Sequence, residues 1–124
     1  METKHKAMSI IKEFRIGNLV ADYETEPHYF AIEEIGLYED GELAVWYRNG
    51  SIMHKDPDLI PLTEEWLLKA GAKRFGKDFT LHGVIIHSRK RGFVINKHIP
   101  TMEYLHQLQN FIFANRGKEL EFKL

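Results

Sequence analysis

The sequence predicts an α+β fold in which a small SH3-like, partly closed antiparallel barrel is followed by a helix, a β-hairpin, a second helix and a short closing strand. Short apolar runs joined by Asp40-Gly41 and Asn49-Gly50 are typical of hairpins, because these dipeptides readily adopt the positive φ of a tight turn. Later in the chain, apolar residues recur at helical spacing in two segments. A chain of 124 residues supports one core, so we expect a single domain over residues 1–124, with 1–9 disordered.

Four consecutive strands are expected to form the barrel. The first covers Phe14 to Asp22 and contains Gly17-Asn18, a pair that indicates a bulge or a tight bend. After a loop, three strands form a meander over Tyr29 to Glu39, Glu42 to Arg48 and Ser51 to His54. Antiparallel strands with a bulged first strand are typical of small, strongly twisted barrels. In the third strand, Trp46 and Tyr47 point to opposite faces, so one is expected in the core and the other at least partly exposed.

The first helix is expected over Glu64 to Ala70. Thr63 suits its N-cap, and two glutamates place negative charge on its first turn. Gly71 suits the left-handed position that follows a helix end. Several local preferences therefore agree on both ends of this helix.

A hairpin and a second helix follow. Phe79 to Ser88 and Gly92 to Lys97 are expected to pair around the tip Arg89-Lys90-Arg91. From Thr101 to Asn115 the apolar residues fall on one side of a helix. A closing strand is expected over Glu119 to Leu124 because its residues alternate in polarity.

Some residues of the second helix fall outside its apolar arc. Met102 and Phe113 lie together on another side, so the helix is either sandwiched between two packed elements or presents a contact patch to a partner. His106 falls on the polar side, where we expect it to be exposed or hydrogen-bonded to a neighbouring loop. Gly117 is expected to end the helix.

Charge is distributed unevenly along the chain. Residues 1–68 contain 14 acidic and 6 basic residues, residues 69–98 contain 1 and 8, and residues 99–124 contain 3 of each. The overall charge of −1 therefore conceals segments of −8, +7 and 0. Such asymmetry favours a surface that binds a partner over a pocket that binds a small substrate.

The basic segment supplies the candidate partner-binding residues. A hairpin folded back on the preceding helix brings its cations to one side, where each contact with a phosphate adds salt-dependent affinity. The alternative is a solvated hairpin tip that only keeps the protein soluble. The acidic stretch from Glu24 to Glu42 is either an exposed polar sheet face or a decoy for a partner's basic groove. The candidate binding residues are Lys73, Arg74, Lys77, Arg89, Lys90 and Arg91.

No catalytic, cofactor or metal motif is found in the sequence. Gly71 to Lys77 has the spacing of a phosphate-binding Walker loop, but Asp78 stands where Ser or Thr must ligate magnesium, so we expect a helix cap and a solvated basic loop. The seven histidines show no metal-ligand spacing; His82 and His87, five apart on a predicted strand, point to opposite faces. We therefore expect no catalytic residues, no bound metal and no cofactor.

Cellular location follows from what the sequence lacks. Without cysteine, the chain forms no disulfide bond, and the reducing cytosol is the natural compartment. No signal-peptide pattern begins the chain, and no apolar stretch has the length of a membrane span. We expect a cytoplasmic protein.

Three stretches carry a resemblance to a known family: Phe14 to Val20, Ile60 to Gly71, and Tyr104 to Asn110 together with Gly117 to Leu120. In their order and spacing, the chain resembles a family of small uncharacterised proteins from phages and prophages of Bacteroidetes bacteria. The likeness spans nearly the whole chain and implies a genomic setting, with no catalytic residue to carry over. Two features depart from the family pattern: Ala70, where an aromatic residue is more usual beside the glycine, and the basic tip Arg89-Lys90-Arg91, which we interpret as a specialisation of this member.

The resemblance implies a function through binding, because small phage proteins without catalytic machinery commonly act on nucleic acid or on a host defence protein. We expect a non-catalytic inhibitor of a host defence nuclease, similar to anti-CRISPR proteins and directed at a type VI RNA-guided RNA-targeting effector. Such effectors combine basic nucleic-acid channels with exposed guide RNA, which suits a bipolar surface. The alternative is a small-barrel accessory protein of a phage that binds RNA or DNA phosphates directly.

Overall fold

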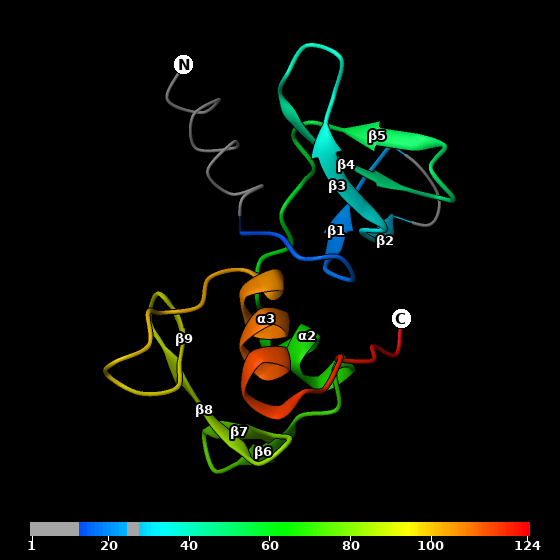
Figure 1. Cartoon of the computed structure of the whole chain (residues 1–124). Coiled ribbons are helices and arrows are strands. Elements are labelled where there is room, and N and C mark those ends of the chain that lie inside the picture. The colour runs from blue at the N-terminus through cyan, green and yellow to red at the C-terminus, as the bar shows by residue number, and fades with distance from the viewer. Residues whose placement is uncertain (1–12, 25–27) are drawn as a thin grey trace. The chain divides into compact units, whose positions relative to one another are not determined.

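The computed structural model describes residues 13–24 and 28–124 and divides the chain into two compact units, Met1–Ile60 and Pro61–Leu124 (Figure 1). The described residues form three small antiparallel sheets and two helices, which confirms the α+β class. They form no closed barrel. The disorder expected for residues 1–9 lies outside the described residues, and the single domain stays a prediction.

The N-terminal unit contains two sheets. One pairs β1 with β2, and the other has the order β3-β4-β5. Both are antiparallel, as the hairpin pattern predicts. The strands are β1 (Leu19–Ala21), β2 (Tyr29–Ala31), β3 (Glu34–Leu37), β4 (Leu43–Tyr47) and β5 (Ile52–His54).

Two of the expected strands are shorter than predicted. Residues 14–18 form a turn, because the Asn18 side chain accepts a hydrogen bond from the backbone N–H of Arg15 at 2.7 Å and Gly17 has φ +97°. The expected strand over residues 29–39 breaks where the chain changes partner. Ile32 donates its N–H to Asn18 O, whereas Glu33 donates to Trp46 O of β4. The residues beyond the break therefore belong to a second sheet.

The two predicted hairpin turns differ in detail. Asn49 and Gly50 both have positive φ, and Ser51 N donates to Arg48 O at 3.1 Å, as the sequence predicts. At the other turn only Gly41 has positive φ, and Tyr38 N donates to Glu42 O at 2.8 Å. This loop therefore contains three residues, and the predicted two-residue turn is wrong. The side chain of Asp40 fixes it by accepting the N–H of Glu42 at 3.0 Å.

Aromatic and β-branched side chains fill the core of this unit. Tyr47 is fully buried and stacks on Phe30 with ring centroids 4.9 Å apart. Trp46, on the other side of β4, is only partly buried, which confirms the prediction for this pair. The buried cluster contains Phe14, Val20, Phe30, Ile32, Val45 and Tyr47.

The C-terminal unit begins with the predicted helix α2 (Glu64–Lys69). The Thr63 hydroxyl accepts the N–H of Trp66 at 3.3 Å and so caps the helix. Gly71 has φ +95°, the left-handed conformation expected after the helix end. Both end signals are confirmed.

A four-stranded antiparallel sheet follows, with the order β6-β7-β8-β9. His82 (φ +48°) and Gly83 (φ +81°) form a tight turn, so the single strand expected over Phe79 to Ser88 is wrong. The solvated loop expected between Gly71 and Lys77 is also wrong, because it contains β6. The hairpin around the basic tip is confirmed, since Arg89 is paired with Gly92. The strands are β6 (Lys73–Phe75), β7 (Asp78–Leu81), β8 (Val84–Arg89) and β9 (Gly92–Val94).

The second helix, α3 (Leu105–Arg116), begins later than predicted. Met102 lies before it and pairs with Phe93 of β9 through two backbone hydrogen bonds. Met102 is 3% exposed, whereas Phe113 is 41% exposed, so the two do not share a helix face. His106 is 2% exposed, so the first of its two predicted alternatives, an exposed side chain, is wrong. Gly117 ends the helix with φ +65°, as expected.

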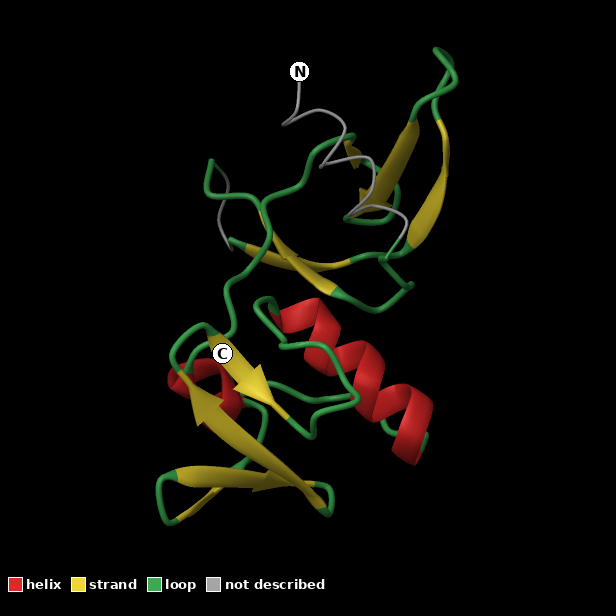
Figure 2. Cartoon of the chain, turned by 90° about the vertical axis from the view of Figure 1, so that its left-hand side faces the viewer, coloured by secondary structure: helices red, strands yellow, loops and turns green. Residues whose placement is uncertain are grey.

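The closing strand expected over Glu119 to Leu124 is not formed. This segment has no regular secondary structure and pairs with no strand among the described residues. Instead, Lys123 donates its N–H to Lys69 O at 2.9 Å, and Phe122 meets the Trp66 ring edge-on. The segment therefore packs against α2. Within this unit both helices lie on one side of the four-stranded sheet (Figures 1 and 2).

Candidate functional site

Strand register divides the side chains of the β6–β9 sheet between two faces. Residues paired across antiparallel strands point to the same side, and neighbours along a strand alternate. The inner face contains Phe79 paired with Ile86, and both are fully buried. The other buried residues of this face are Leu81, Val84 and Phe93.

The opposite face is basic and partly apolar. We call it the outer sheet surface and define it by the outward residues of the strands and the three basic residues of the adjoining turns. Phe75 and Ile85 are 61% and 45% exposed on it. Its residues are Lys73, Phe75, Asp78, Thr80, Ile85, His87, Arg89 and Val94 on the strands and Lys77, Lys90 and Arg91 in the turns.

Four of the predicted binding residues are unpaired cations on this surface. Lys73, Lys77, Lys90 and Arg91 are all exposed. Within residues 13–24 and 28–124, none of them forms an ion pair with a carboxylate. Their charges are therefore available to an anionic partner.

Arg74 belongs to the other face. It is paired in register with Phe79, and its guanidinium lies over that ring, 5.2 Å from the centroid. It also forms an ion pair with Glu64 at the start of α2. Arg74 therefore lies apart from the other predicted binding residues and links α2 to the sheet.

Asp78 organises the centre of the outer sheet surface. Its carboxylate is 3.0 Å from His87 Nδ1, accepts the N–H of Ser88 at 3.2 Å and lies 3.9 Å from Arg89 Nη1. The hydrogen bond with His87 is the main reason that the pKa of Asp78 is lowered; partial burial opposes it, and the Ser88 N–H adds to it. Arg89 is therefore partly neutralised, unlike the two tip residues that follow it.

The position of Asp78 also shows that this segment is not a Walker loop. Asp78 begins β7 and braces a hairpin, and residues 73–75 form a strand where that motif needs a loop. Among the residues that the structure describes, no three His, Asp or Glu side chains gather where they could hold a metal ion. The sequence placed His82 and His87 on one strand, but His82 lies in the turn between β7 and β8.

The charge asymmetry of the sequence coincides with the two units. Met1–Ile60 contains 12 acidic and 6 basic residues, and Pro61–Leu124 contains 6 acidic and 11 basic. Their formal charges are −6 and +5, which give the chain its −1. The basic unit is therefore the one that carries the outer sheet surface.

Sequence reasoning missed a polar cluster in the N-terminal unit. Asp22, 8% exposed, is 3.2 Å from His54 Nε2. Burial alone would raise the pKa of Asp22, but the hydrogen bonds from His54 and from the Glu24 backbone outweigh it and lower the pKa. Burial, followed by the negative charge of Asp22, raises the pKa of the Tyr47 phenol to about 12. Tyr47 Oη is buried near the Asp22 carboxylate, but the two do not meet in hydrogen-bond geometry, and no other described residue accepts its proton. The separation of these residues in the sequence hides the cluster.

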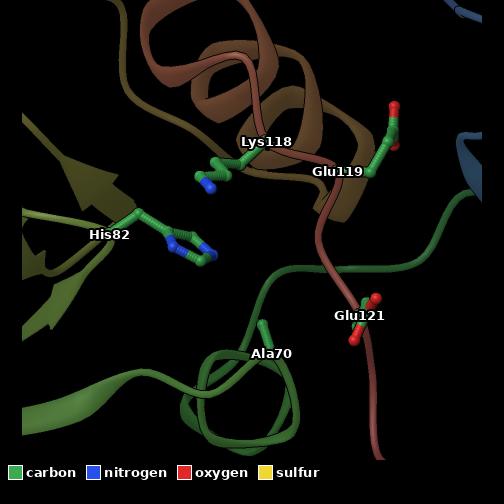
Figure 3. A pocket seen from close by; sticks show the side chains of 5 residues that line it. All are labelled: Ala70, His82, Lys118, Glu119 and Glu121. Carbon is green, nitrogen blue, oxygen red and sulfur yellow. The ribbon is translucent and has the colours of Figure 1, made fainter.

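An open pocket of about 350 Å³ lies beside the turn between β7 and β8 in the C-terminal unit. Its lining includes His82 and Lys118, whose side chains point toward one another, while Glu119 points away (Figure 3). Arg116 fixes the turn beside it by donating from Nε to His82 O at 3.1 Å. Its remaining lining residues are Ala70 and Glu121. Cations and carboxylates are mixed around the opening, so the pocket favours neither an anionic nor a cationic ligand.

Comparison with protein-family models, curated proteins and solved structures finds no match to this chain. Within the described residues, neither helix combines the length and apolar character that crossing a bilayer requires. The candidate functional site therefore rests on the outer sheet surface itself, with Lys73, Lys77, Lys90 and Arg91 as its unpaired cations.

Proposed function

We propose that this protein is non-catalytic and acts by binding, with the outer sheet surface contacting the nucleic acid of a ribonucleoprotein. The observation that carries the proposal is a group of unpaired cations, with Lys73 on the outer face of the sheet and Lys77, Lys90 and Arg91 in the turns that adjoin it. Phosphates are the natural counter-charge for such a surface, and each neutralised phosphate releases counterions.

The setting of this contact comes from the sequence resemblance to phage and prophage proteins. In that setting, we infer that the protein inhibits a host defence nuclease in the host cytoplasm, as anti-CRISPR proteins do. A type VI effector is the target that the basic surface suits, because it exposes guide RNA alongside its protein channels. The acidic N-terminal unit supports the same proposal, since it offers a complementary charge to a basic protein groove.

A second candidate is favoured by the exposed aromatic ring among the cations. Phe75 lies on the same surface as Lys73, and this combination is typical of proteins that bind nucleic acid directly. The chain would then be a phage accessory protein that needs no host protein. The SH3-like small barrel proposed for the N-terminal strands belongs to this candidate.

One pair of measurements separates the two. The purified protein is added to a type VI effector loaded with guide RNA, and cleavage of a target RNA is followed; inhibition at stoichiometric protein is expected for the first candidate. In parallel, bare RNA is titrated at low salt. A mobility shift of bare RNA without inhibition supports the second candidate, and neither effect would show that both are wrong.

The variant Lys90→Glu with Arg91→Glu supplies the surface control. It should lose inhibition in the first assay and the mobility shift in the second, because both depend on the same cations. Glu33→Gln with Glu34→Gln tests the decoy interpretation of the acidic stretch. Loss of inhibition in that acidic variant alone would move the contact to the N-terminal unit.

A further inference from the structure

The outer sheet surface carries two apolar side chains that the core does not use. Phe75 and Ile85 are exposed on the face opposite to the fully buried Phe79 and Ile86. Leaving an aromatic ring in water forgoes the stabilisation that its burial would provide. Packing within this unit therefore gives no reason for an aromatic residue at position 75.

Position 75 is also open on one side. The strand register places Phe75 opposite Asp78 of β7, and β6 is an edge strand of the sheet. Lys73 lies two residues earlier on the same face, and Lys77 follows in the turn. A flat ring is thus flanked along the chain by two unpaired cations.

We propose that this surface binds a single-stranded segment of nucleic acid, with one base stacked on Phe75 and the neighbouring phosphates at Lys73 and Lys77. The inference rests on the proposed function and names the form of nucleic acid that the surface takes. Every base has a flat face that stacks on an aromatic ring, and lysines meet the backbone. In a duplex these base faces are already stacked on one another, so no base is free to stack on Phe75.

Charge argues for a polyanion over an apolar protein patch. Lysine is depleted at the centres of protein–protein interfaces, whereas here unpaired lysines precede and follow Phe75 along the chain. The one carboxylate of the surface, Asp78, is engaged by His87 and Arg89. These contacts reduce the repulsion that an acidic ligand meets from Asp78, which lies opposite Phe75.

Fluorescence anisotropy with three labelled probes tests the proposal: a mixed-sequence RNA 12-mer, the DNA 12-mer of the same sequence, and the RNA paired with its complement. We expect both single strands to bind more tightly than the duplex at equal salt. Phe75→Ala should weaken single-strand binding on the order of 5- to 150-fold, the loss of one stacked base, without changing the salt dependence. Phe75→Trp should preserve it.

The chain offers a matched control. Phe113 is another exposed phenylalanine, on α3, and Phe113→Ala should leave binding of all three probes unchanged. Because Phe75 is exposed, its variants should retain the wild-type circular dichroism spectrum.

Three outcomes would overturn the stacking proposal. If duplex and single strands bind equally and Phe75→Ala changes neither, the cations alone bind nucleic acid, and the proposed function survives. If Phe75→Ala impairs only the binding of a guide-loaded effector, the ring contacts protein. If the wild type binds none of the probes, the inference fails, while the cleavage assay still decides the inhibitor function independently.

Discussion

Asp78 and His87 pair across β7 and β8, with Nδ1 and Oδ2 3.0 Å apart, at the centre of the outer sheet surface. Strand register puts the two residues side by side, and the backbone N–H of Ser88 secures the same carboxylate. The pair therefore ties the start of β7 to β8, close to the point where β8 enters the turn that carries the basic tip. It is also the one acidic feature that a bound phosphate chain would approach.

This pairing predicts an acid-dependent loss of stability. The folded-state pKa of Asp78 lies below its ordinary value of 3.8. The contribution of the ionised carboxylate to stability is therefore complete above pH 3.8 and is lost as the pH falls through the lower, folded-state pKa. Urea unfolding of the wild type and of Asp78→Asn should therefore differ near neutral pH and converge in strong acid. An equally large difference at all pH values would contradict the assignment to ionised Asp78.

Tyr47 should behave in the opposite sense at alkaline pH. Its folded-state pKa is raised to about 12. The contribution of the protonated phenol to the stability of the fold is therefore present below the ordinary pKa of 10.0 and is lost as the pH rises through the folded-state value. Tyr47→Phe should remove that alkaline loss.

At neutral pH the same substitution should change the unfolding free energy by less than about 1 kcal/mol or stabilise the fold, because the buried hydroxyl lies near Asp22 but forms no hydrogen bond of normal geometry among the described residues. Chemical denaturation at the two pH values measures both effects. A clear destabilisation at neutral pH would show that the hydroxyl has a partner after all.

Local rules predicted the elements whose ends are marked by short-range chemistry. Thr63 and Gly71 delimit α2, and Asn49-Gly50 adopts the predicted turn. The sequence does not predict the His82-Gly83 turn because His-Gly is not one of the usual hairpin dipeptides, and apolar residues on both sides of it favour a single strand. The prediction begins the helix at Thr101 because Tyr104 falls on the same apolar arc as the residues that follow it. Backbone pairing between Met102 and Phe93 decides otherwise, and periodicity does not reveal such pairing.

The candidate site was predicted in composition but not in arrangement. Sequence clustering found the cations, yet the face on which each one lies depends on strand register. Because a loop is expected where β6 lies, no sequence pattern separates Arg74 from Lys73 or predicts that Phe75 points outward. The ion pair of Arg74 with Glu64 follows from the same register.

Trp66→Ala should destabilise the protein by about 3–5 kcal/mol, the usual cost of truncating a large buried side chain. Trp66 is buried in α2, with the Phe122 ring edge-on and Lys69 Nζ 4.8 Å from its ring centroid. Thermal unfolding measures the effect, and Leu68→Ala, at an exposed position of the same helix, is the control. An unchanged melting temperature for Trp66→Ala would show that the helix is not anchored through this residue.

Gly92→Ala should destabilise the basic hairpin. A Cβ atom at this position would lie 2.5 Å from Met102 O, and the residue has φ +147°. Steric overlap and backbone strain together should cost about 1–3 kcal/mol. Hydrogen exchange of the Phe93 amide, which donates to Met102 O, reports the effect locally. Undiminished protection of that amide would contradict the close approach of the two segments.

Reversing charge on the outer sheet surface tests the function most directly. Lys90→Glu with Arg91→Glu should abolish partner binding while leaving the fold intact, because an exposed turn contributes little to stability. Arg89 is left unchanged in this design, since a glutamate there would face Asp78 and disturb the hairpin itself. Binding is measured by titration of the guide-loaded effector and of bare RNA at several salt concentrations.

Single substitutions then distinguish a binding cation from a structural one. Lys73→Ala should weaken binding and reduce the dependence of log K on log salt by about 1, as expected for one lost phosphate contact. Arg74→Ala is the matched control from the same strand: its guanidinium pairs with Glu64 on the inner face, so it should leave the salt dependence unchanged. If Arg74→Ala and Lys73→Ala reduce the salt dependence equally, the assignment of the two faces is wrong. If the double reversal binds with wild-type affinity, the basic tip is only solvated, and the contact must be sought on the acidic N-terminal unit.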